Sequence, residues 1–110
     1  MKATFTTGPR GPAIETPDYP ALGVILSMDG NRPEAWFLIR FSEALQAVLA
    51  GDVPEYEVGQ NEVSTSITPQ RVEIVVSEME DGSAAFRDSV PTQECADVVA
   101  RWRAYLADPR

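Results

Sequence analysis

The chain has 110 residues, of which 44% are hydrophobic and 24% charged, the size and composition of one soluble globular domain. Seventeen Asp and Glu face nine Lys and Arg, and the formal net charge of −8 argues against binding to nucleic acid or to an anionic membrane, because both draw affinity from cations. The chain has no histidine and one cysteine, which excludes the commonest general base and metal ligand, an internal disulfide and a Cys-rich zinc site.

The N-terminal part is divided by clusters of Gly and Pro. Residues 2–7 alternate loosely and predict a first strand, and a short extended piece is expected around Ile14. The apolar residues 22–28 predict a buried strand, and residues 34–41, rich in aromatic and β-branched side chains, predict another. Because Asp29-Gly30-Asn31 between them is a strong turn signal, we expect these two strands to form a hairpin.

A short helix is predicted next, over residues 42–50. Ser42 is typical of a helix N-cap, and Leu45, Val48 and Leu49 recur at helical spacing. Gly51 is a suitable residue to end it. A helix this short is not stable alone, so it should dock on the sheet.

Four short strands follow, separated by Pro and by turn signals at residues 60–62 and 80–83. They are predicted over residues 55–59, 63–68, 71–77 and 84–90. Alternating side chains predict that each of the first three has one buried face, with Tyr56 and Val58 pointing inward from the first of them.

The C-terminal segment predicts a helix over residues 93–107, with Thr92 as its N-cap. One apolar stripe runs along it, made of Cys95, Val98, Val99, Trp102, Tyr105 and Leu106. The chain is therefore expected to be a single α+β domain over residues 1–110. Its mainly antiparallel sheet of about five to six strands should carry the short helix and the longer C-terminal helix on one face.

The residues give little support for catalysis. Cys95 lies on the apolar stripe, so we expect a packed and inert thiol. Trp36 and Trp102 stand in apolar contexts and are expected in the core. No glycine-rich phosphate-binding motif occurs, and no cofactor or metal is expected. Two converging carboxylates in a deep pocket would favour an enzyme or a ligand-binding domain, whereas a convex surface would oppose both.

The layout of the chain resembles the bacterial immunity proteins that neutralise contact-dependent growth inhibition toxins and related polymorphic toxins. The resemblance is carried by the strand at 36–41, the helix at 42–50, the strands within 55–77, and the closing helix at 93–107. That last helix contains the run Cys95-Ala96-Asp97-Val98-Val99-Ala100 and Tyr105. The resemblance implies tight binding to a cognate toxin, usually a nuclease, without catalysis, and it assigns no role to any residue.

The acidic residues indicate the same class of partner. A flat polar strand surface with excess carboxylates suits docking to a cationic protein, although the same acids can serve solubility alone. The contact candidates are Glu55, Glu57, Glu62, Glu78, Glu80 and Asp81. A cytoplasmic toxin inhibitor is thus expected, because no signal or membrane span is visible. A non-catalytic adaptor and, less favoured, a carboxylate-based enzyme or ligand-binding domain remain as alternatives, and the oligomeric state is left open.

Overall fold

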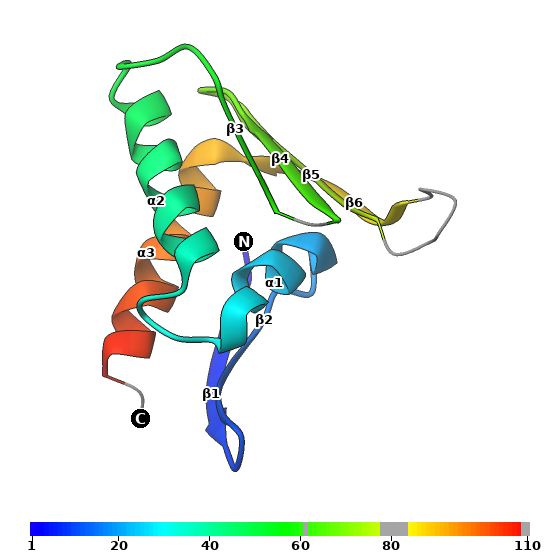
Figure 1. Ribbon diagram of the computed structural model, residues 1–110, viewed down its shortest axis with the longest axis vertical. Coiled ribbons are helices and arrows are strands. Elements are labelled where there is room, and N and C mark those ends of the chain that lie inside the picture. The colour runs from blue at the N-terminus through cyan, green and yellow to red at the C-terminus, as the bar shows by residue number, and fades with distance from the viewer. Residues whose placement is uncertain (61, 78–83, 109–110) are drawn as a thin grey trace.

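The computed structural model describes residues 1–60, 62–77 and 84–108, and it shows an α+β protein (Figure 1). The described strands form two antiparallel sheets, one of two strands and one of four. In chain order the elements are β1 (Thr4–Gly8), β2 (Gly11–Glu15), α1 (Pro20–Leu26), the 3-10 helix η1 (Met28–Gly30), α2 (Trp36–Leu49), β3 (Tyr56–Gln60), β4 (Val63–Ile67), β5 (Arg71–Ser77), β6 (Ala84–Pro91) and α3 (Thr92–Ala107). The predicted fold class is confirmed.

The larger sheet is built from consecutive antiparallel strands in the order β3-β4-β5-β6. The predicted ends of these four strands agree with the structure to within one residue, because turn residues and prolines separate the strands along the chain. Val72, Ile74 and Val76 of β5 are buried, as their spacing of two predicts. Tyr56 lies on the inner face with Val58, as predicted, because it pairs with the buried Ile67, but it stays 36% exposed since its strand lies at the edge of the sheet. The predicted turn at 80–83 lies outside the described residues.

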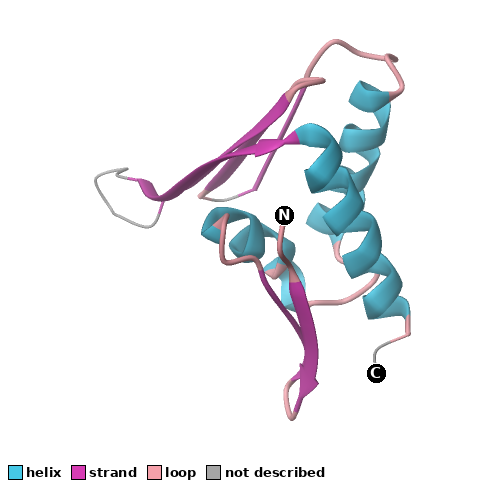
Figure 2. Cartoon of the chain, turned by 180° about the vertical axis from the view of Figure 1, so that it is seen from behind, coloured by secondary structure: helices cyan, strands magenta, loops and turns pink. Residues whose placement is uncertain are grey.

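The helices all lie on one side of the four-stranded sheet, where they cover its apolar face (Figures 1 and 2). The predicted C-terminal helix is confirmed, and it buries Cys95, Val98, Val99, Trp102 and Leu106. The indole Nε1 of Trp102 donates a hydrogen bond to the Leu26 carbonyl, at 2.9 Å, and so ties α3 to α1. Thr92, expected as the N-cap, is the first helical residue, and its hydroxyl donates to the Thr68 carbonyl at 2.7 Å.

The strand predicted over residues 22–28 is wrong, since this stretch lies mostly in α1. Its buried residues are Ala21, Leu22, Ile25 and Leu26, which is helical spacing. Pro20 stands in the first turn, where a missing N–H costs nothing. A short apolar run has no clear period, so the sequence alone does not separate a buried strand from a buried helix here.

The strand predicted over residues 34–41 is also wrong, and with it the predicted hairpin. Residues 36–49 form one helix of 14 residues, so that Ser42 lies inside it rather than at its N-cap. Phe37, Phe41, Leu45 and Val48 form a single buried stripe that crosses the position where the prediction placed a boundary. The helical period becomes visible only when both pieces are taken together.

The small sheet β1–β2 forms an arm that projects from the body (Figure 2). A lone two-stranded hairpin is marginally stable, so its base must be held by tertiary contacts. The Phe5 ring lies 5.6 Å from the ring centroids of both Trp102 and Tyr105, and Ile14 is buried. The strand predicted at 2–7 and the extended piece around Ile14 are the two strands of this arm.

Candidate interaction surface

The side of the four-stranded sheet away from the helices is a mostly polar surface. The strand register places alternate residues there, because side chains on opposite strands of a pair share a face. One row across the sheet runs Glu57, Ser66, Glu73 and Ser89. The next row runs Gly59, Ser64, Val75 and Arg87.

The half of this surface on β5 and β6 is held by a charge-assisted network. The Arg71 guanidinium donates to the hydroxyl and the carbonyl of Ser89, at 2.9 and 2.6 Å. The Ser89 hydroxyl in turn donates to a carboxylate oxygen of Glu73 at 2.7 Å. Ser89 thus joins Arg71 and Glu73, whose opposite charges offset each other. Arg87 adds a further exposed cation. The sequence alternation predicts that Glu73 points outward, but sequence reasoning missed the network, because it joins residues on different strands.

The half on β3 is acidic. Glu55 directly precedes β3, Glu57 lies on its outer face, and Glu62 lies in the turn to β4. All three side chains are exposed, and none makes a hydrogen bond or ion pair with another described residue. Residues 41–70 contain five acidic residues and no Lys or Arg. The structure therefore places three of the six predicted contact residues on the edge strand β3 or at its two ends, whereas Glu78, Glu80 and Asp81 lie outside the described residues.

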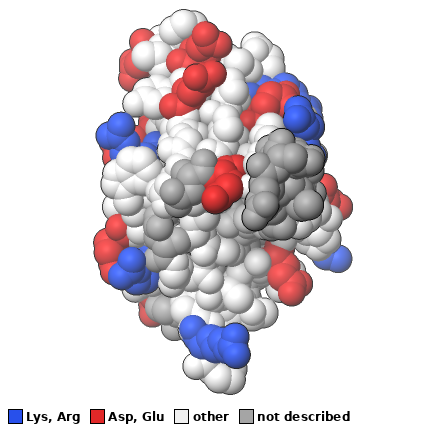
Figure 3. Space-filling model, turned by 45° about the vertical axis from the view of Figure 1, so that its right-hand side comes forward, with Lys and Arg blue, Asp and Glu red and all other residues white. Residues whose placement is uncertain are grey.

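Exposed charged side chains also lie away from β3. Figure 3 shows Asp and Glu in separate groups with Lys and Arg between them. Some of these acids have local structural partners. Glu94 pairs with the amino group of Met1 at 2.9 Å, which raises the pKa of that amine, mainly through this hydrogen bond. Asp97 accepts a hydrogen bond from the Gln93 amide at 3.0 Å. Acidity as such is therefore less informative than its concentration along β3.

The two tryptophans occupy opposite environments. Trp102 is fully buried, as expected, but Trp36 is 53% exposed at the start of α2. The Arg40 guanidinium carbon lies 6.0 Å from the centroid of the Trp36 ring, a cation–π distance. The expectation that Trp36 is a core residue is wrong, because the helix turns its other face to the sheet.

Cys95 lies within the core between α3 and the sheet. Burial raises the pKa of its thiol to about 12. Since the thiolate is the nucleophile, such a thiol is unreactive at neutral pH. This agrees with the inert thiol predicted from the apolar stripe.

Two open hollows flank α1. One, of about 590 Å³, lies between α1 and β2 and is mostly apolar, and its acidic residue is Glu15. The other, of about 510 Å³, lies between α1 and the turn end of β3–β4, and its acidic residue is Glu62. Within the described residues, each hollow thus has one carboxylate rather than the converging pair that acid–base chemistry needs.

The part of the chain that the structure describes has neither a cluster of metal-binding residues nor a helix that could span a membrane. No three Cys, Asp or Glu residues come together in a group able to hold a metal ion. No described helix is both long enough and apolar enough to cross a bilayer.

Comparison with known proteins gives no match: no family model fits the chain, and no curated protein or solved structure is significantly similar to it.

Proposed function

We propose that this chain is an immunity protein that binds a cognate cationic protein toxin, most simply a nuclease, and neutralises it by covering its active or substrate-binding surface. The observation that carries the proposal is the acidic edge strand β3, where Glu55, Glu57 and Glu62 are exposed and unpaired among the described residues. No Lys or Arg occurs in residues 41–70, and none of the three side chains forms an ion pair with a described cation.

The electrostatic reason is that proteins acting on nucleic acid carry Lys and Arg to bind phosphates. A surface of carboxylates meets those same cations, so it competes with the substrate for one site. Complementary charge also raises the association rate and disfavours wrong partners, an effect that salt weakens. The proposed inhibitor needs no chemistry of its own, which is consistent with the single carboxylate in each described hollow.

The experiment starts from the genes beside this one in its native genome. If a neighbour encodes a large secreted protein with a basic C-terminal domain, that domain is expressed in bacteria with and without this chain. Growth arrest by the domain, relieved by co-expression of this chain, is the expected result. An arrest that this chain does not relieve would reject the proposal. A non-catalytic adaptor would bind its partner without relieving any toxicity.

The surface is tested on the purified pair. Reversing two charges in Glu55→Lys and Glu57→Lys should weaken binding by about tenfold or more at low salt, and less at high salt. The matched control reverses two exposed acids away from the four-stranded sheet, Glu15→Lys and Asp18→Lys, with the same change in net charge. Equal losses for both double variants would mean that only net charge matters, and the β3 surface would be rejected.

A further inference from the structure

The outer edge of β3 carries backbone groups that point away from the sheet. In a hairpin with a two-residue loop, the residues that flank the loop exchange hydrogen bonds, and bonded and non-bonded pairs then alternate. Gln60 and Val63 flank such a loop. The alternation therefore turns the N–H and C=O groups of Glu57 and Gly59 away from β4. Hydrogen bonds on the far side of β4 agree: the Ser77 N–H donates to the Glu62 carbonyl at 2.9 Å.

The two edges of the sheet differ in how they are protected against pairing. On β6 the partner register shifts near Val76 and Ser77, the charged Asp88 points inward, and Pro91 ends the strand. Register shifts, inward charges and prolines are devices that block the addition of another strand. Over its five residues β3 has none of them: it pairs with β4 in continuous register and contains no Pro or Lys.

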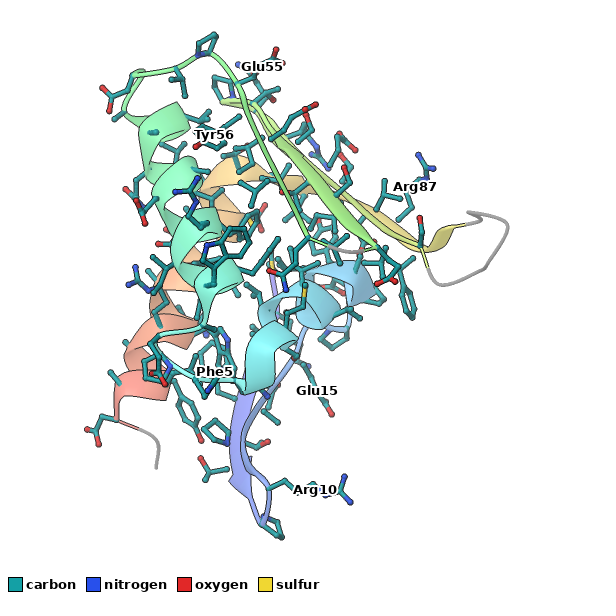
Figure 4. All side chains as sticks on the ribbon, viewed as in Figure 1. Phe5, Arg10, Glu15, Glu55, Tyr56 and Arg87 are labelled. Carbon is teal, nitrogen blue, oxygen red and sulfur yellow. The ribbon has the colours of Figure 1, made fainter. Side chains whose placement is uncertain are left out.

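The carboxylates next to the β3 edge determine which kind of strand can pair with it. Glu57 projects from the middle of the strand, and Glu55 and Glu62 lie beyond its two ends. The cations of this sheet surface lie farther from the β3 edge: Arg71 is on β5 and Arg87 is on β6. Figure 4 labels Glu55 beside the start of β3 and Arg87 on β6. A strand added beside β3 therefore meets carboxylates, so a Lys- or Arg-bearing strand is favoured and an acidic one is repelled.

We propose that the free edge of β3 takes up an extended, cationic segment of the partner as a fifth strand of this sheet. The backbone groups of Glu57 and Gly59 form the new hydrogen bonds, and alternate Lys or Arg side chains of the segment reach the three carboxylates. The inference rests on the proposed function, since it names the surface on which the cationic partner docks. Main-chain pairing supplies affinity and the acids supply selectivity.

The probe is an eight-residue peptide of alternating Lys and Thr, added to the full chain. Binding is followed by NMR, with hydrogen exchange measured at each backbone amide. We expect slowed exchange at the amides of Glu57 and Gly59, and no slowing along β6. The same peptide N-methylated on alternate residues keeps its charge but lacks N–H groups on one edge, and it should bind about tenfold more weakly.

Variants of the chain separate charge from pairing. Glu57→Gln removes the charge and keeps the N–H, so it should weaken peptide binding a few-fold, whereas Glu57→Pro also removes the outward N–H and should weaken it about tenfold or more. Arg87→Pro is the matched control, because it places proline at an outward position of the opposite edge strand and should leave binding unchanged.

Three results would each overturn strand addition: equal binding of the N-methylated peptide, unchanged binding by Glu57→Pro, or protection confined to another surface. If Glu57→Pro does not fold, the peptide comparison and the exchange data on the unchanged chain decide. If the peptide does not pair with β3 but the chain still neutralises a toxin, only the inference of strand addition is rejected. Protection of the β3 edge by the peptide without neutralisation of any toxin rejects the proposed function alone.

Discussion

The carboxylate of Asp88 on β6 accepts a hydrogen bond from the backbone N–H of Ala21 at 2.6 Å, and so caps the start of α1 from 67 residues away. The helix has no N-cap side chain of its own, since Tyr19 at that position makes no capping bond. A residue of the sheet therefore satisfies a donor that the local sequence leaves open. The same contact explains why a charged residue points to the inner side of an edge strand.

Asp88→Ala should destabilise the protein by about 1–2 kcal/mol, because a helix cap is lost and a partly buried N–H is left without its acceptor. Urea unfolding followed by circular dichroism measures this. Asp97→Ala is the control, since it removes an exposed acid whose partner among the described residues is the nearby Gln93 side chain, and its effect should stay within about 0.5 kcal/mol. Similar losses in the two variants would show that the cap contributes nothing.

Gly23 in α1 allows a close approach between this helix and the chain before it. A Cβ at this position would lie 2.8 Å from the Thr16 hydroxyl oxygen, which is buried and donates to the Tyr19 carbonyl. In an open helix Gly→Ala stabilises by up to about 1 kcal/mol, but here the contact should reverse the sign. Gly23→Ala is expected to destabilise the protein, and to stabilise it when Thr16→Ala is present. A double-mutant cycle in urea tests this, and additive effects would contradict it.

The thiol of Cys95 should make stability depend on pH in the alkaline range. Its folded pKa of about 12 is above the ordinary value of 9.0, so the unfolded chain loses this proton first. The stability from the neutral thiol is complete below pH 9 and is lost as pH rises toward 12, by about 1.4 kcal/mol per pH unit. The difference in unfolding free energy between the wild type and Cys95→Ala, measured from pH 7 to 10.5, isolates this effect from other titrating groups. A difference that does not change with pH would contradict burial of the thiol.

The two tryptophans should respond very differently to truncation. Trp102→Ala removes a fully buried indole and its hydrogen bond to Leu26, and should cost about 3–5 kcal/mol. Trp36→Ala removes a half-exposed ring and should cost less than about 1 kcal/mol. Urea unfolding compares them, and fluorescence gives a check on folded protein: Trp36→Phe should leave an emission that iodide does not quench. Strong quenching in that variant would place Trp102 at the surface.

Local pattern was sufficient for the strands of the larger sheet and for α3. In β5, Val72, Ile74 and Val76 recur at every second position, and polar residues at 71, 73 and 77 reveal this period of two although Val75 interrupts it, so the strand ends agree with the prediction. In α3, Cys95, Val98, Val99 and Trp102 repeat at helical spacing over several turns. In both cases polar residues on the other face reveal the period, because one side of the element meets water.

The spacing of apolar residues did not predict the correct element where apolar residues follow one another closely. Around Leu22 and Ile25, and again around Phe37 and Phe41, few polar residues interrupt the run, so strand and helix predict almost the same composition. The aromatic residues near Phe37 favoured a strand by propensity, which tertiary packing overrides. The helix there is stabilised by burial of the apolar stripe from Phe37 to Val48. A short stretch of sequence contains only part of this stripe, so it does not show the helical period.

Some features of the candidate surface follow from the sequence, whereas others depend on the tertiary structure. That Glu57 faces outward follows from its position beside Val58 in an alternating strand, and the net charge of −8 follows from composition. That β3 is an edge, and that Arg71 and Arg87 lie on the other half of the surface, depends on the order of strands in the sheet. Strand order and the capping of Ala21 by Asp88 arise from contacts between residues far apart in the chain. Periodicity shows which side of a helix or strand is apolar, but not which other element packs against that side. Contacts between distant elements are therefore decided only by the tertiary structure.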